Sequence, residues 1–446
     1  FDLLRQGVRP SAQAMDGTMK KWMLALGSCV VTVASVVAQV PNVQIDAYDG
    51  TGYQPCEPSL AISPVDPDVM VAGSILDNVY TSQDGGKTWT KDVLTSRYGV
   101  FGDPCVVASP RGDFYYLHLS DPEGAGWASE SLLDRIVCQR STDGGRSWSK
   151  GGGMGLSGAK DQDKEWAVVS ADNKRIHACW TQFDRYNSRE AGDSTLILCS
   201  HASKAGNKWS TPVRVSDVAG DCLDGDNTAE GAVPAVGTNG EVYVAWALGD
   251  WIWFDRSTDG GRSWGKDRAV ASVVGGWDQT IPGIGRCNGM PVTCVDHSDG
   301  PHRGRIYVNW TDNRNGDNDV WLTHSDDGGN SWSPTQRVNN DGPGRDQFFT
   351  WMTVDPVRGD VHVVFYDRRH NGSAAERSTH VVVASSTDGG ATWTNRQVSE
   401  TPFVPAGQTF FGDYNNISAV DGHVRPIWTR EDLGVLSVWT ALLDLE

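Results

Sequence analysis

An eight-residue pattern, Ser-x-Asp-Gly-Gly-x-Ser/Thr-Trp, occurs five times in this chain of 446 residues. Its aspartates are Asp84, Asp143, Asp259, Asp327 and Asp388. An Asp side chain in such a turn accepts hydrogen bonds from nearby backbone N–H groups, and glycine reaches positive φ without steric cost. Residues of high strand propensity flank every copy. Each copy therefore predicts a β-hairpin turn covered by its tryptophan.

A sixth, degenerate copy ends at Trp209, where the Asp-Gly-Gly core is lost. The six tryptophans recur every 55 to 68 residues, and they are Trp89, Trp148, Trp209, Trp264, Trp332 and Trp393. Each period holds four short β runs and no helical periodicity. One hairpin per period of about 60 residues predicts a radial repeat whose unit is a four-stranded propeller blade.

The number of blades depends on the two ends of the repeat region. Residues 42–48 look like a strand without neighbours, and three strand-like runs follow the last box unit near residues 416–420, 424–428 and 435–442. Joining the first run to the last three completes one more blade. We therefore predict an all-β β-propeller of four-stranded antiparallel blades over residues 39–446, with seven blades favoured over six.

The five boxes resemble the Asp box, or BNR repeat, of the sialidase superfamily. In that family the box is a structural hairpin away from the active site, so the resemblance implies the propeller fold and no chemistry at the boxes. The family members have six blades, and the seventh expected here departs from them. The resemblance also implies glycoside hydrolysis.

The first residues have the composition of an export signal. Two lysines precede an apolar run that ends at Ala38, which predicts a signal peptide over residues 19–38 and upstream translation over residues 1–18. A membrane anchor, or a lipoprotein signal at Cys29, is the alternative. The first 38 residues carry four basic and two acidic groups, so the rest of the chain has a formal charge of −20. This charge argues against nucleic-acid or anionic-membrane binding and suits a secreted or periplasmic monomer.

Eight cysteines remain beyond the signal, an even number that suggests disulfides in an exported protein. Three pairings fit the expected strands, namely Cys105–Cys138, Cys179–Cys199 and Cys287–Cys294. Buried free thiols are the alternative for each pair.

Propeller topology predicts where a site forms. The boxes occupy the turns between third and fourth strands, so the first-strand starts and second-strand ends meet at the opposite face, where ligand sites of propellers lie. The first-strand starts carry a series of polar residues, namely Glu57, Asp103, Glu165, Glu230, Asn288, Gln347 and Asp413. Mutual repulsion among these carboxylates raises pKa values, which keeps a general acid protonated. A structural ring that bonds backbone N–H groups is the alternative.

The second-strand ends share an aromatic residue followed by Asp and Arg. These segments contain Arg185, Arg314, Arg368, Arg369 and Arg430. An Arg fork binds a carboxylate with two parallel hydrogen bonds, and aromatic faces stack on sugars. Ion pairs between neighbouring loop residues, such as Arg368 with Asp367, are the alternative.

The sialidase resemblance implies a carboxylate clamp of three Arg, a Tyr nucleophile helped by Glu, and an Asp acid/base. By blade position these are Arg314, Arg368 (or Arg369) and Arg430, with Tyr366 or Tyr414, Glu230 and Asp103. The Arg-Ile-Pro of the family is replaced by Glu57-Pro58-Ser59, so one clamp Arg is missing. An acidic mouth also suits a neutral glycan better, with paired carboxylates drawn from Asp103, Glu165, Glu230 and Asp413.

We therefore expect a glycan or polysaccharide substrate and two sets of site residues. The expected catalytic residues are Asp103, Glu230, Tyr366, Asp413 and Glu165. The expected substrate-binding residues are Arg314, Asp367, Arg368, Arg369, Arg430, Tyr414, Glu57 and Gln347.

Two other classes remain open. A polysaccharide lyase needs a base beside an Arg, and His370 next to Arg368, Arg369 and Tyr366 is the best such set. A glycan- or protein-binding propeller without catalysis is the other class. No cofactor is required by either reading. Calcium fits loosely at residues 312–319 and at Asp221, Asp224 and Asp226, although the position-12 Glu of an EF-hand is missing.

Overall fold

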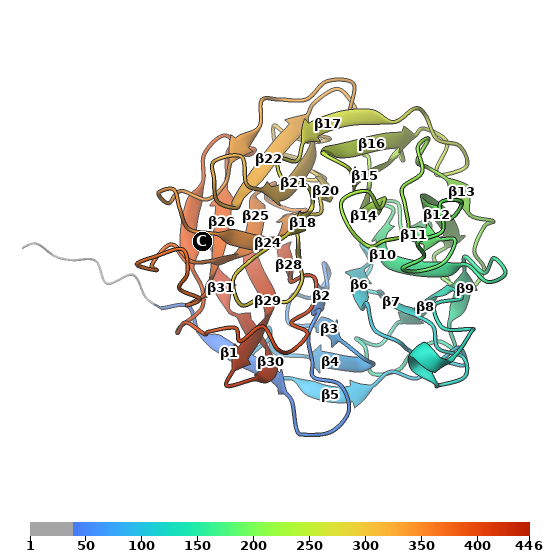
Figure 1. Ribbon diagram of the computed structural model, residues 1–446, viewed down its shortest axis with the longest axis horizontal. Coiled ribbons are helices and arrows are strands. Elements are labelled where there is room, and N and C mark those ends of the chain that lie inside the picture. The colour runs from blue at the N-terminus through green and yellow to red at the C-terminus, as the bar shows by residue number, and fades with distance from the viewer. Residues whose placement is uncertain (1–38) are drawn as a thin grey trace, which may run out of the picture. The chain divides into compact units, whose positions relative to one another are not determined.

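The computed structural model describes residues 39–446, and the predicted upstream segment and signal peptide lie outside the described residues. The described residues form seven antiparallel sheets around a common centre, so the prediction of a seven-bladed propeller is confirmed. Figure 1 shows the first strand of each blade nearest the centre and the later strands progressively further out. Within residues 39–446, no helix has the length and apolarity that crossing a membrane requires.

The first three blades follow one another in the chain. Blade 1 consists of β2 (Ser59–Ile62), β3 (Met70–Ser74), β4 (Asn78–Ser82) and β5 (Thr90–Val93). Blade 2 consists of β6 (Cys105–Ala108), β7 (Phe114–Leu119), β8 (Ile136–Ser141) and β9 (Gly152–Met154), with the short helix η1 (Gly126–Ala128) between β7 and β8. Blade 3 consists of β10 (Asp161–Val169), β11 (Arg175–Phe183), β12 (Thr195–Ser203) and β13 (Val213–Arg214).

The next three blades repeat this order. Blade 4 consists of β14 (Glu230–Val236), β15 (Val242–Leu248), β16 (Trp251–Ser257) and β17 (Arg268–Ser272). A small two-stranded sheet, β18 (Asp278–Gln279) with β19 (Cys287–Asn288), interrupts the crossover to blade 5. Blade 5 consists of β20 (Val292–Val295), β21 (Ile306–Asp312), β22 (Asp319–Ser325) and β23 (Gln336–Arg337). Blade 6 consists of β24 (Gln347–Val354), β25 (Val361–Asp367), β26 (His380–Ser386) and β27 (Thr394–Gln397).

The seventh blade joins both ends of the described chain. It consists of β28 (Asn416–Val420), β29 (His423–Asp432), β30 (Val435–Ala441) and, as its outermost strand, β1 (Asn42–Ala47), while β31 (Leu443–Asp444) pairs with β29. Strand β1 runs antiparallel to β30, with Asn42 opposite Ala441 and Ala47 opposite Ser437. The predicted strand at 42–48 therefore closes the ring.

The Asp boxes form the hairpins between third and fourth strands. In the first box, Thr88 donates from its backbone N–H (2.9 Å) and its hydroxyl (2.7 Å) to the two carboxylate oxygens of Asp84. Gly85 and Gly86 adopt φ values of 76° and 89°, which a residue with a Cβ reaches only with strain. Trp89 Nε1 donates to the Gly86 carbonyl at 2.9 Å, and in the degenerate copy Trp209 keeps the same contact with Gly206. The degenerate copy thus shares this contact with the first box, whereas the indole N–H groups of Trp148, Trp264, Trp332 and Trp393 have no hydrogen-bond partner in the described structure.

The cysteines follow the expectation in part. Cys179 and Cys199 lie opposite each other on β11 and β12 and are bridged. Cys105, Cys138, Cys287 and Cys294 are free, so the other two expected pairings are not present in the structure. Cys105 and Cys138 both face the apolar interior between blades, where the free thiols pack as small hydrophobic side chains.

The first strands of all seven blades surround an apolar channel of about 290 Å³. Three aromatic residues, Trp166, Trp351 and Tyr414, meet in this channel, with ring centroids 4.3 Å apart for the two tryptophans and 5.7 and 6.0 Å apart for each with the tyrosine. We call these three residues the aromatic plug. The plug separates the apolar channel from a polar pocket described next.

Candidate functional site: a carboxylate pocket

A pocket of about 370 Å³ lies over the aromatic plug. Its walls come from the loops between second and third strands and from the crossovers between blades. In an antiparallel blade these connections emerge at the end opposite to the box hairpins. Seven acidic residues line it, which defines the carboxylate pocket: Glu57, Asp103, Asp163, Asp224, Glu230, Asp278 and Asp413.

Unusual backbone geometry at the first-strand starts presents several of these side chains. Glu57, Asp103 and Lys164 have φ values of 52°, 50° and 54°, and each lies two residues before a regularly paired strand residue. In blades 3 and 4 the register shifts at this position, between Asp163 and Trp166 and between Glu230 and Val233. Such a bulge bends the strand and redirects its side chains. The acidic groups are therefore turned into the pocket mouth rather than into the blade interfaces.

Asp413 is the centre of the charged floor. Its side chain is 3% exposed and accepts hydrogen bonds from Lys164 Nζ at 2.9 Å and from Arg286 Nε at 2.8 Å, with a second Arg286 contact through Nη2. Although burial opposes it, these two cations hold the pKa of Asp413 below its ordinary value. Glu57 fixes the backbone here by accepting from the Asp413 N–H at 3.1 Å.

A second cluster surrounds Asp224. One of its carboxylate oxygens accepts from Arg286 Nη1 at 2.7 Å and from the Tyr186 hydroxyl at 2.6 Å. Arg286 therefore bridges Asp413 and Asp224. Both cations that line the pocket, Lys164 and Arg286, are held by pocket carboxylates.

Burial raises the pKa of each of the remaining pocket carboxyl groups. Burial and the neighbouring Asp103 raise the pKa of Glu57, and the Glu57 side chain hydrogen-bonds to that of Asp103. Burial and the charges of Asp224 and Asp163 raise the pKa of Glu230. Burial and Asp103 raise the pKa of Asp163 to about 8. The pocket thus holds protonated carboxyl groups at neutral pH beside ionised ones.

Glu230 differs in its contacts from Glu57 and Asp413, the other fully buried acids of the pocket. Its side chain is 2% exposed and lines the pocket, yet it makes no hydrogen bond or ion pair with any residue of the described chain. A buried polar group without a partner costs free energy unless solvent or a ligand reaches it. Glu230 is therefore oriented for something that enters the pocket.

Aromatic side chains form the upper wall. Tyr53, Phe101, Trp127, Tyr186, Trp277 and Phe410 all line the pocket. Trp127, carried by η1, is 68% exposed and lies edge-on to Phe101 at 6.0 Å and tilted to Tyr186 at 5.7 Å. Exposed aromatic faces above a polar floor are typical of pockets that bind sugar rings.

The expected site residues lie in three places: in the carboxylate pocket, beneath it beside the aromatic plug, and away from it. Asp103, Glu230, Asp413 and Glu57 line the carboxylate pocket. Glu165 and Tyr414 lie beneath it, beside the aromatic plug. Glu165 lies one residue after the left-handed Lys164, and both of its carboxylate oxygens are buried without hydrogen-bond partners.

The expected tyrosine nucleophile at Tyr366 lies outside the pocket. Its hydroxyl donates to the Thr429 carbonyl at 2.8 Å and accepts from the Thr429 N–H at 3.0 Å, which ties blade 6 to blade 7. The side chain is 1% exposed. This contact gives Tyr366 a structural role, and the tyrosines that line the pocket are Tyr53 and Tyr186.

The expected arginine clamp is not assembled. Each of three arginines binds an Asp two positions away in sequence, Arg314 with Asp312 (2.5 Å), Arg369 with Asp367 (2.7 Å) and Arg430 with Asp432 (2.5 Å). Arg314 also stacks over Trp321 at 4.5 Å. These three arginines therefore form ion pairs with neighbouring loop residues, which was the alternative to a carboxylate clamp. None of the three lines the pocket.

Arg368 and His370 also lie away from the pocket. Arg368 is 2% exposed, stacks on Phe348 at 5.1 Å and donates from Nε to Thr379 at 3.1 Å. His370 packs against His380 at 5.5 Å. The set of residues expected for a lyase therefore does not gather in the pocket.

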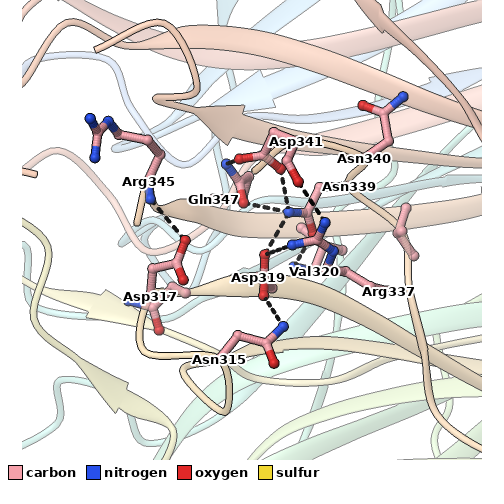
Figure 2. Close-up of polar contacts among 12 residues, drawn as sticks. Asn315, Asp317, Asp319, Val320, Arg337, Asn339, Asn340, Asp341, Arg345 and Gln347 are labelled. Atoms are coloured by element: carbon pink, nitrogen blue, oxygen red, sulfur yellow. Dashed lines mark hydrogen bonds and ion pairs between the residues drawn. The ribbon is translucent and has the colours of Figure 1, made fainter. Parts of the chain in front are cut away.

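Gln347 and the candidate calcium loop belong to one polar network between blades 5 and 6 (Figure 2). Asn339 donates from Nδ2 to Gln347 and to Asp319, both at 2.6 Å, and Asp319 also accepts from Asn315 at 2.7 Å. Asp317 accepts from the backbone N–H groups of Gly344 and Arg345 at 2.7 and 2.8 Å. Protein donors thus occupy these carboxylates, and no group of three His, Cys, Asp or Glu within residues 39–446 is placed to hold a metal.

Several residues that line the pocket were not among the site residues expected from the sequence, and they include Asp163, Lys164, Tyr186, Trp127, Asp278 and Arg286. Arg286 lies on the β18–β19 excursion, whose signal is the longest tryptophan spacing, the 68 residues from Trp264 to Trp332. Asp163 and Lys164 directly precede Glu165 in the sequence. The strand bulge decides which of these three side chains face the pocket, and the residue types do not predict the bulge.

The raised pKa values predict how stability changes with pH. Asp and Glu have pKa values near 4 in the unfolded chain. A carboxyl group whose pKa is higher in the folded protein therefore lowers the free energy of unfolding as the pH rises from about 4 to that higher pKa. Burial lowers the pKa of three histidines, His118, His177 and His362, to about 4. These histidines therefore raise the free energy of unfolding as the pH rises to about 6.5, and they do not change it above that pH. We therefore expect the free energy of unfolding to fall above pH 6.5, by about 2 kcal/mol up to pH 8 from Asp163 alone.

Chemical denaturation at pH 6.5 and 8 measures this decrease. Asp163→Asn removes one titrating group and should make the decrease smaller, while Glu57 and Glu230, whose pKa values are also raised, still contribute to it. A free energy of unfolding that is constant or rising over this interval contradicts the assignment of buried, protonated carboxyls.

Comparison with known proteins agrees with this architecture. A BNR/Asp-box repeat model matches residues 80–91. The NanB sialidase of Streptococcus pneumoniae superposes with a TM-score of 0.51 at 10% identity, covering 78% of this chain and 69% of that one. Hadza microbial sialidase Hz136 gives 0.48 at 15% identity, covering 85% and 75%. The α-L-arabinofuranosidase Arb93A from Fusarium graminearum gives 0.47 at 14%, covering 78% and 98%. At these identities the similarity concerns the fold.

Proposed function

We propose that this chain, a BNR/Asp-box β-propeller with the fold of the sialidase superfamily, is an exported glycoside hydrolase that acts in the carboxylate pocket. The single observation that carries the proposal is Glu230, a buried carboxyl without a protein partner, next to further carboxyl groups and below an aromatic wall. Glycoside hydrolysis uses such a pair, one carboxylic acid and one carboxylate. The Cys179–Cys199 disulfide supports an oxidising compartment.

The two roles follow from the environments of the groups. Glu230 is the general acid, because Asp224, Asp163 and burial keep its proton in place. Asp103 is the proposed base. Burial raises its pKa, but the charge of Lys164 and the hydrogen bond with Glu57 oppose this effect and favour its carboxylate form. The Glu230 proton passes to the glycosidic oxygen as the bond to the anomeric carbon breaks. Asp103 takes a proton from the water that attacks this carbon.

The pocket argues against an anionic sugar. Both of its cations are engaged with Asp413 and Asp224, so no lining cation is left to hold a substrate carboxylate. Sialic acid is therefore a poor fit. A glycan without carboxylate groups meets only hydrogen-bonding carboxyls and aromatic faces.

Turnover of a glycan panel by residues 39–446, with products detected by mass, tests the proposal. Glu230→Gln and Asp103→Asn should each lower kcat by about 100-fold or more, the usual effect of losing a general acid or base. The melting temperature should change little, because both substitutions keep the size of the side chain and remove a buried acid. Glu241→Gln, in the hairpin between β14 and β15, is the matched control and should leave kcat unchanged.

Full activity in both pocket variants would exclude these two groups as catalysts. Loss of folding in both variants would instead show that the acids form a structural ring. Absence of turnover on every glycan would leave a sugar-binding propeller as the better description.

A further inference from the structure

Acidic side chains outnumber basic side chains among the residues that line the pocket. Of its seven acidic residues, Asp413 and Asp224 bind the two lining cations, Lys164 and Arg286. The other five form no ion pair within the described chain, and they are Glu57, Asp103, Asp163, Glu230 and Asp278. Each additional negative charge on this floor is opposed by its neighbours. A ligand that brings a positive charge relieves this repulsion, whereas a neutral ligand does not.

The second observation is independent of the charge count. Glu230 is 98% buried and has no hydrogen-bond donor among the described residues, although its side chain lines the pocket. A ligand hydroxyl supplies one hydrogen bond to this carboxyl. A ligand ammonium supplies a charge-assisted hydrogen bond, which is about twice as strong as one between neutral groups.

The wall above Glu230 suits the same ligand. Trp127 exposes 68% of its surface at the pocket, and Tyr186 stands beside it at 5.7 Å. Aromatic faces attract an ammonium group and also stack on the C–H face of a sugar ring. The carboxylates below therefore suit the ammonium group of such a ligand, and the aromatic faces above suit its sugar ring.

We propose that the carboxylate pocket selects amino sugars, that is, glycans with free, protonated amino groups, over their N-acetylated and carboxylated counterparts. The proposal rests on the glycan function proposed above and specifies its substrate class. The ammonium group lies against Glu230, whose neighbouring acids are Asp224 and Asp163. The sugar ring lies against Trp127. N-acetylation removes the positive charge of the amino group. A carboxylate on the sugar is repelled by the acidic residues of the pocket.

Calorimetric binding of two tetrasaccharides to residues 39–446 tests the proposal. The probes are a β-1,4-linked glucosamine tetramer and the N-acetylglucosamine tetramer of the same linkage. We expect the free-amine tetramer to bind at least about tenfold more tightly, the equivalent of one modest charge interaction. The preference should shrink as sodium chloride is raised, because salt screens charges at a partly open pocket.

Two pocket variants and one control assign the preference. Glu230→Gln should reduce the ratio of the two affinities by at least about fivefold, since the ammonium then loses its partner. Asp163→Asn serves the same purpose if Glu230→Gln does not fold. Glu241→Gln, outside the pocket, should keep the full preference.

The outcomes separate this proposal from the hydrolase proposal. Equal binding of the two tetramers, or tighter binding of the N-acetylated one, overturns the amino-sugar preference whether or not a glycan is hydrolysed. A preference for the amine that Glu230→Gln and Asp163→Asn both leave intact also overturns it. Amine-selective binding without turnover supports this proposal and counts against the hydrolase.

Discussion

Replacing Asp413 by asparagine is expected to destabilise the domain and to abolish the function of the pocket together. Asp413 is 3% exposed and is the shared partner of Lys164 and Arg286. Removing one member of a buried ion pair leaves an uncompensated charge and costs about 3–5 kcal/mol. We expect about 3 kcal/mol, because the Arg286 side chain is 44% exposed and water takes over part of its solvation.

The effect on ligands follows from the released cations. Without Asp413, Lys164 and Arg286 gain conformational freedom and turn toward Asp103 and Glu57. Both cations already act on these two groups, so the pKa values of Asp103 and Glu57 should fall. Glu57 then loses its proton, and with it the hydrogen bond that supports Asp103 as the proposed base.

Guanidinium unfolding and calorimetric binding measure the two effects. Asp278→Asn is the matched control for stability, because Asp278 is an exposed acid of the same pocket without an ion pair. It should change the free energy of unfolding by no more than about 0.5 kcal/mol. If Asp413→Asn has an equally small effect, the ion-pair cluster does not hold the pocket together.

The part of the site that was predictable from sequence is the part set by strand position. Glu57, Asp103, Glu230 and Asp413 all lie at the first-strand starts, and topology alone brings such starts to one mouth. Burial and mutual charge raise the pKa values of Glu57 and Glu230, as expected for a crowded set of acids, whereas Lys164 and Arg286 lower that of Asp413. These residues needed only the repeat and the alternation of strand direction.

The other expectations failed where local contacts outweigh blade position. Arg314, Arg369 and Arg430 each have an Asp two residues away, and an ion pair across a tight turn loses less side-chain entropy than one formed across the pocket. Tyr366 is held by a backbone group of the next blade. A repeat places a residue near the mouth, but its nearest partner decides where the side chain points.

Bulges and excursions account for the residues that were missed. In β10, where Lys164 is left-handed, Asp163 and Lys164 line the pocket and Glu165 lies beneath it, although all three are adjacent in sequence. Nothing in the residue types marks this bulge. Arg286 comes from a two-stranded excursion without a counterpart in the other blades.

Removing residues 39–47 is expected to have the largest effect on stability. Strand β1 adds five paired positions to β30 and is the only contribution of the N-terminal side to blade 7 within residues 39–446. Its Asp46 accepts from Tyr80 at 2.6 Å and Lys91 at 2.8 Å in blade 1, and Asn42 donates to Val398 next to blade 6 at 2.7 Å. Loss of about five hydrogen bonds, each worth about 1 kcal/mol net, predicts a decrease of about 5 kcal/mol in the free energy of unfolding.

A peptide of residues 39–48 added in trans distinguishes ring closure from a general effect of truncation. Because the peptide binds the folded truncated domain at the exposed edge of β30, it should raise the melting temperature in a concentration-dependent way. A peptide of the same composition in shuffled order has no matching register with β30 and should have no effect. An unchanged unfolding midpoint in the truncated domain would show that three strands suffice to close the propeller, and that β1 is an accessory to a ring held by the contacts between neighbouring blades.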